Sequence, residues 1–191
     1  MNKNFPKPSN AIGWYLALRK HFPEWLVASP RTKMHPLPWP ARFNPYMDSV
    51  FSYNEIFIEG VTPDKIFDVL ISAKKWSSFY PNAEAVEIPN CEKLFPGCEF
   101  QWKTFATKQK SKIELYEQDY ALGWSAESPG THAFHRWILE PKSHGTLVIT
   151  EECQNGITAW LDRFVMNPGL HAAHQLWLEG ISSQLSVRSS Q

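Results

Sequence analysis

Two residue types in the second half of the chain could move a proton: a histidine and a glutamate on successive strand-like runs. His135 lies between apolar neighbours in the run from Ala133 to Leu139, so strand alternation would point its imidazole into the interior. Glu151 and Glu152 follow in the run from Thr146 to Gln154, and alternation sends one of them inward. A buried imidazole beside a carboxylate whose pKa is raised by desolvation is suited to general acid–base chemistry.

Strand alternation alone does not decide which glutamate faces inward, because the answer depends on which apolar neighbours face the interior. The phase that places Ile149 inside favours Glu151. A simpler reading is that His135 is a core histidine held by a tyrosine or a carbonyl group. The glutamates would then be exposed or paired at an edge.

His171 and His174 are three residues apart in a helix-period segment, so they occupy neighbouring positions on one side. Such a pair can bind a metal ion with a third ligand, which Glu152 or His135 could supply. No carboxylate motif accompanies the histidines, and residues facing the mouth of a pocket explain them more simply. We therefore expect no metal and no cofactor. The sequence also lacks a glycine-rich phosphate loop and a nucleophile elbow.

Composition excludes several classes of partner. Nineteen basic and nineteen acidic residues cancel, which argues against nucleic acid. Nine tryptophans and twelve phenylalanines favour a bulky core or an aromatic-lined pocket. Three cysteines without CxxC spacing fit a reducing, cytoplasmic setting. The apolar run from Ala11 to Leu18 is too short to span a bilayer, so no stable membrane insertion is expected.

The elements that must position these residues can be read from their periodicity. A strand over Val50 to Gly60 precedes a helix that begins at Thr62-Pro63-Asp64, with Thr62 as its cap. A short helix or turn follows from Lys74 to Tyr80. Six strand-like runs come next, namely Ala85–Ile88, Glu99–Ala106, Ser111–Gln118, Ala121–Ser128, Ala133–Leu139 and Thr146–Gln154. One of the turns predicted between them is Lys108–Lys110.

The last element is the longest helix-period segment, from Ile157 to about Val187, with a kink or short gap expected at Asn167–Gly169 because of Pro168. Short connections between the strands require antiparallel neighbours. The sequence therefore predicts an α+β fold, in which a curved antiparallel sheet of about seven strands wraps on a long C-terminal helix. We assign this domain to residues 50–191.

Residues 1–49 form a separate N-terminal arm in this interpretation. Ser9 and Asn10 can cap a short helix from Ala11 to Phe22, after which proline is too dense for regular structure. Three tryptophans in the arm need burial, at Trp14, Trp25 and Trp39. We expect the arm to lie across the main domain or to reach a second subunit, in which case the chain would form a homodimer.

Taken in order, these runs resemble the START/Bet v 1-like (SRPBCC) superfamily, which includes polyketide cyclase/dehydrase-like proteins. The resemblance covers about residues 50–187. The runs that carry it are TPDKIFDVL, Trp76 to Asn82, FPGCEFQWKT, LGWSAESPG, HRWILEP, GTLVITEE and the terminal HAAHQLWLEGI helix. The resemblance implies a helix-grip fold with a deep cavity for a hydrophobic small molecule between sheet and helix. Its lone glutamate four residues before the closing glycine favours Glu152 as the inward carboxylate. Oxygenase relatives are set aside because no Rieske-type Cys/His cluster is present.

The leading hypothesis is a protein that binds a lipid, a polyketide-like compound or an aromatic compound. The expected walls of its cavity are Phe100, Trp102, Tyr116, Trp124, Trp137, His174 and Trp177. The main alternative is a cyclase, dehydratase or isomerase in which His135 and Glu152 transfer a proton on the bound substrate. A third hypothesis is a protein-interaction module with a filled cavity and an exposed apolar surface.

Overall fold

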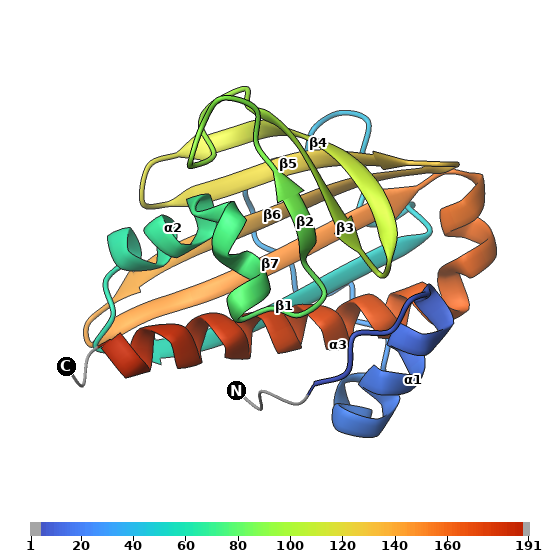
Figure 1. Ribbon diagram of the computed structural model, residues 1–191, viewed down its shortest axis with the longest axis horizontal. Coiled ribbons are helices and arrows are strands. Elements are labelled where there is room, and N and C mark those ends of the chain that lie inside the picture. The colour runs from blue at the N-terminus through green and yellow to red at the C-terminus, as the bar shows by residue number, and fades with distance from the viewer. Residues whose placement is uncertain (1–4, 189–191) are drawn as a thin grey trace.

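The computed structural model describes residues 5–188 and shows a curved sheet gripping a long helix (Figure 1). The sheet has seven antiparallel strands in the order β1-β7-β6-β5-β4-β3-β2, as the short connections predicted. Their bounds are β1 (Val50–Glu59), β2 (Glu84–Glu87), β3 (Glu99–Thr104), β4 (Thr107–Glu117), β5 (Ala121–Ser128), β6 (Thr131–Lys142) and β7 (Gly145–Asn155). The α+β helix-grip fold is thereby confirmed.

The helices frame this sheet. They are α1 (Ala11–His21), α2 (Pro63–Ile71) and α3 (Ile157–Arg188), with short 3₁₀ helices η1 (Pro23–Trp25) and η2 (Ala73–Ser78). The Asn10 side chain accepts a hydrogen bond from Gly13 N (2.8 Å), so Asn10 caps α1. Thr62 precedes α2, but within the described residues its side chain makes no capping hydrogen bond.

Helix α3 runs through Pro168 without a gap, and its first turns lie at a clear angle to the long segment that follows (Figure 1). The Asn167 side chain fixes this region to the start of β1: its Oδ1 accepts from Phe51 N (3.0 Å) and its Nδ2 donates to Ser49 O (3.1 Å). The missing amide of Pro168 accounts for the bend, since it removes one hydrogen bond of the helix. Of the two predicted outcomes, the kink is correct.

One predicted turn is wrong. Lys108–Lys110 are part of β4, and the reversal between β3 and β4 is made by Phe105 and Ala106, both with positive φ (50° and 59°). Phe105 N donates to the Asn82 side chain (2.6 Å), and its ring is buried. These tertiary contacts hold an unfavourable backbone conformation that the sequence pattern does not signal.

The second half of the arm, residues 29–49, lies across the outer face of the sheet. Arg136, buried on β6, donates to the carbonyl groups of His35, Leu37 and Pro38 (3.1, 2.6 and 3.2 Å). A small apolar cluster adds to this contact, formed by Phe43, Phe51, Phe134 and Cys153 with Met34 and Trp39 against it. The arm therefore contacts its own domain, and a homodimer through the arm stays a prediction.

Within residues 5–188, no helix is both long and apolar enough to cross a membrane.

Candidate functional site

Three polar residues meet where the inner face of the sheet faces α3. His135 on β6 and Glu152 on β7 are directly opposed in the strand register, and His174 reaches them from α3. All three are buried, with exposed fractions of 2%, 8% and 1%. Glu152 Oε2 lies 3.3 Å from His135 Nδ1 and 3.3 Å from His174 Nε2, and the two imidazole rings stack with centroids 4.5 Å apart. The inner face thus holds one carboxylate between two histidines.

Neighbours on β7 orient this group. Thr150 and Gln154 point inward with Glu152 because alternate residues of a strand share a face. Thr150 Oγ1 lies 2.7 Å from His135 Nε2, and Gln154 Nε2 donates to Glu152 Oε1 (2.6 Å). Burial holds the pKa of His135 well below its usual value of 6.5, and the nearby His174 lowers this pKa further. The His135 imidazole is therefore neutral near pH 7.

The structure settles which glutamate faces inward. Glu152 does, whereas Glu151 lies on the outer face, where its carboxylate binds Arg136 (2.7 Å) and accepts from His35 N (2.8 Å). The phase argument from Ile149 was wrong. Ile149 is buried on the outer face, which the arm covers at Glu151, so residues on both faces of β7 are buried and burial does not distinguish the faces.

A cavity of about 250 Å³ opens beside the three residues. Four predicted wall residues line it, namely Trp102, Trp124, His174 and Trp177, together with His135 and Glu152. Small side chains on β5 and β6, Ala126 and Ala133, leave the space, and Tyr80 and Leu170 add to the walls. The rim is formed by α1 and the first turns of α3, with Ala11, Thr158, Ala159, Asp162 and Met166.

The other three predicted wall residues lie elsewhere. Tyr116 packs edge-on against Phe67 of α2 (5.2 Å between centroids), outside the lining of the cavity. Phe100 and Trp137 point inward as predicted, but they pack against Trp124 and Trp177 and do not line the cavity. The cavity is therefore smaller than the predicted one, because aromatic side chains fill the interior beside it.

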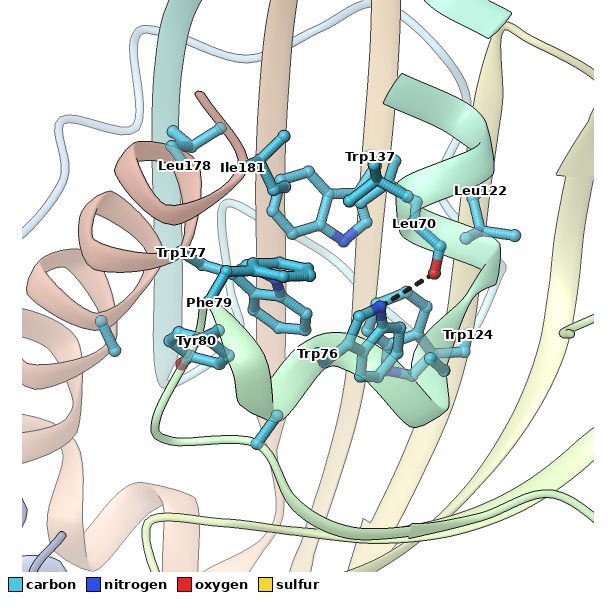
Figure 2. Close-up of a cluster of buried hydrophobic side chains, with 14 of the residues drawn as sticks. Leu70, Trp76, Phe79, Tyr80, Leu122, Trp124, Trp137, Trp177, Leu178 and Ile181 are labelled. Carbon is cyan, nitrogen blue, oxygen red and sulfur yellow. Dashed lines mark hydrogen bonds between the residues drawn. The ribbon is translucent and has the colours of Figure 1, made fainter. Parts of the chain in front are cut away.

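That filled interior is a cluster of stacked aromatic rings (Figure 2). Trp177 stacks flat on Tyr80 (4.2 Å, 9°) and meets Trp76 and Trp137 edge-on (5.1 Å each). Trp76 Nε1 donates to Leu70 O (2.9 Å), which ties η2 to the end of α2. The roles of Trp76 and Tyr80 were missed by sequence reasoning, although both lie in a run that carried the family resemblance.

The joint metal site that the spacing of His171 and His174 would allow does not form. His171 Nδ1 donates to Val27 O of the arm (2.9 Å), and its ring packs against Trp25. His174 turns into the cavity instead, where its Nδ1 is buried with no hydrogen-bond partner among the described residues. Thr150 and Gln154 were also missed, although counting by two from Glu152 would have found them.

Comparisons with known proteins agree with this architecture. No protein-family model matches the sequence, and no curated protein matches it significantly. Solved structures do match. Hypothetical protein jhp0584 from Helicobacter pylori is 23% identical with a TM-score of 0.72, covering 80% of this chain and 97% of that one. The protein TTHA0849 from Thermus thermophilus is 14% identical with a TM-score of 0.62, covering 73% and 99%.

The di-domain ARO/CYC StfQ from the steffimycin biosynthetic pathway also shares the fold, at 13% identity and a TM-score of 0.61. The match covers 75% of this chain and 54% of StfQ, so this chain spans about half of that protein. The chain therefore has the START/Bet v 1-like, polyketide cyclase-like fold that the sequence resemblance predicted. At these identities the fold is all that is shared, and function has to be argued from the site.

Proposed function

We propose that the protein binds one small, mainly apolar molecule with a polar group, in the cavity between the sheet and α3. The observation that carries this proposal is the combination of aromatic walls with a polar group at one place on the wall. Ligand sites have this composition, because apolar walls supply affinity and a few polar groups fix orientation. The cavity volume of about 250 Å³ suits a compound of about two fused rings. The fold shared with StfQ, a di-domain ARO/CYC from the steffimycin biosynthetic pathway, is the reason to keep polyketide-like compounds among the candidate ligands.

Binding can be tested with 2-naphthol, a bicyclic aromatic that carries one hydroxyl group. We expect saturable 1:1 binding, seen as quenching of tryptophan fluorescence and as shifts of the Trp102 and Trp177 indole signals in NMR spectra. Ala133→Phe fills the cavity from β6 and should weaken binding by at least about tenfold, or about 1.4 kcal/mol. Tyr116→Phe is the matched control, since Tyr116 is outside the cavity lining. Equal binding by wild type and Ala133→Phe would place the probe elsewhere.

A second candidate function is proton transfer on the bound molecule, favoured by the position of Glu152 between two imidazoles on the cavity wall. Glu152 would take a proton from a carbon next to a carbonyl group and return it to the resulting enolate, and His135 would orient the carboxylate. This makes the chain a cyclase-, dehydratase- or isomerase-type enzyme. The interaction-module hypothesis has less support, because it requires a filled cavity and a cavity of about 250 Å³ is present beside Glu152.

Proton transfer can be tested with 2-tetralone in D₂O, in buffer that contains a chelator. Wild-type protein should accelerate deuterium incorporation next to the carbonyl group, and Glu152→Gln should reduce the acceleration by about 10²- to 10⁴-fold. His132→Ala is the control, because His132 is on the same strand but is half exposed. No acceleration by wild type would leave the binding function alone. Unchanged exchange in His135→Ala would remove His135 from the catalytic assignment.

A cytoplasmic setting is part of the proposal. It is supported by the free thiols of Cys91, Cys98 and Cys153, two of which are buried.

A further inference from the structure

We propose that His135, Glu152 and His174 form a binding site for a divalent transition-metal ion of the Zn²⁺ class, with its open coordination position toward the cavity. This inference goes beyond binding of an organic molecule. It is carried by the positions of three potential ligand atoms on three elements: a strand, the neighbouring strand and the long helix. One ligand atom from each of the three residues can be chosen so that all lie within 4.8 Å of one another.

The separations fit a metal ion better than they fit hydrogen bonds. Charge-assisted N–H···O bonds are normally about 2.7–2.9 Å long, yet Glu152 Oε2 lies 3.3 Å from both imidazole nitrogens. Around a tetrahedral Zn²⁺ ion with bonds of about 2.0–2.1 Å, neighbouring ligand atoms are about 3.3–3.4 Å apart. Both 3.3 Å distances therefore match the edge of a metal-centred tetrahedron.

Neighbouring side chains form hydrogen bonds to two of the proposed ligands and orient them, as is common around metal ions in proteins. Thr150 Oγ1 holds His135 Nε2, which leaves Nδ1 directed at Glu152 and available to a metal ion; in that state Nε2–H donates a hydrogen bond to the hydroxyl oxygen. Gln154 holds Glu152 Oε1, which leaves Oε2 directed at both histidines. Two of the three ligands are thus oriented through the atom that does not face the proposed ion.

His174 completes the set. Its imidazole is 1% exposed, and its Nδ1 has no partner among the described residues. The other ring nitrogen, Nε2, lies 3.3 Å from Glu152 Oε2 and is the atom that would bind the ion. Among the described residues no hydrogen bond to Nδ1 fixes the ring, so the ring can adjust its angle to an ion. Two histidines and one carboxylate leave a coordination position open on the cavity side, an arrangement typical of sites where the metal meets a ligand or substrate.

The site can be tested on the full chain with Zn²⁺ and Co²⁺ alone, after removal of bound metal with a chelator. We expect one equivalent of Co²⁺ to give the visible absorption of a four-coordinate ion and one equivalent of Zn²⁺ to displace it. In ¹⁵N spectra of the histidine side chains, Zn²⁺ should shift His135 Nδ1 and His174 Nε2. This measurement needs no variant, so it does not depend on a substituted chain folding correctly.

Variants then assign the ligands. Glu152→Gln and His174→Ala should each weaken Zn²⁺ binding by more than about 100-fold, and Thr150→Val by about 10- to 100-fold, as loss of an outer support does. His171→Ala, one turn away and bonded to Val27, is the matched control and should change nothing. Sub-stoichiometric binding would overturn the proposal. So would a loss of binding in His171→Ala equal to that in His174→Ala, or NMR shifts at other histidines.

The outcome is separable from the two proposed functions. The metal titration contains no organic molecule, so it can fail while 2-naphthol binds, and the reverse also holds. With an ion bound, Glu152 is a ligand and is no longer free as a base. Added Zn²⁺ should therefore suppress the deuterium exchange measured in chelator, whereas Zn²⁺ without a site here would leave that exchange unchanged.

Discussion

Replacing Arg136 by methionine is expected to lower the free energy of unfolding by about 3–5 kcal/mol at pH 7. The Arg136 side chain is fully buried, as is that of its partner Glu151, and their ion pair is 2.7 Å long. The guanidinium also lies over the Trp39 ring (3.9 Å) and donates to carbonyl groups of the arm. Loss of the arginine leaves a buried carboxylate without its cation, which is among the most costly single changes in a protein core.

The penalty should depend on pH in a defined direction. Burial raises the pKa of Glu151 above its usual value of 4.5, and Arg136 is the main influence that lowers it. Without Arg136 this pKa rises further, so the folded variant holds a proton that the unfolded chain releases above about pH 4.5. Stability of the variant therefore falls as pH rises from 4.5 through the folded pKa. Urea unfolding should show a smaller difference from wild type at pH 5 than at pH 7.

The double variant Arg136→Met/Glu151→Leu is the control, because it removes both charges and should recover much of the lost stability. Trypsin adds an independent readout. The arm loses its main polar attachment in Arg136→Met, so cleavage at exposed Lys33 should become faster than in wild type. A penalty below about 1 kcal/mol together with unchanged cleavage would show that the arm does not depend on the ion pair.

The sequence was sufficient for the sheet and the long helix because those depend on local patterns. Short connectors determine antiparallel neighbours, and three- and four-residue spacing identifies α3 even across Pro168. Local patterns could not predict which face of β7 points toward the interior. Alternation shows that Glu151 and Glu152 face opposite ways, but the arm buries the outer face too, so apolar content could not say which face was inside.

The sequence predicted which residues belong to the site better than it predicted how they are arranged. His135 and His174 were identified from residue type and spacing and Glu152 from the family resemblance, and the structure brings the three together from three elements. Which histidine of the pair at 171 and 174 turns inward depends on the arm, because Val27 and Trp25 bind His171. The size of the cavity depends on how the aromatic rings stack, and a composition count does not contain that information.

Replacing Trp177 by alanine is expected to lower the free energy of unfolding by about 3–5 kcal/mol and to enlarge the cavity. Trp177 is 1% exposed and lines the cavity on one side while it packs against the aromatic cluster on the other. Its removal should therefore join the cavity to space inside the cluster. Neighbouring rings fill such a space only in part, because the interior of a protein relaxes incompletely around a lost side chain.

Two substitutions on α3 give this experiment its controls. Trp177→Phe keeps a ring in place and removes a buried indole N–H that has no partner among the described residues, so it should cost less than about 1.5 kcal/mol. Trp160→Ala removes a half-exposed tryptophan and should change stability by only about 0.5 kcal/mol. Ligand size provides the second readout: Trp177→Ala should bind pyrene, a four-ring compound, whereas wild type should bind 2-naphthol and exclude pyrene. If Trp177→Ala excludes pyrene as wild type does, Tyr80 and Trp76 must close over the space, and the aromatic cluster rather than Trp177 sets the limit on ligand size.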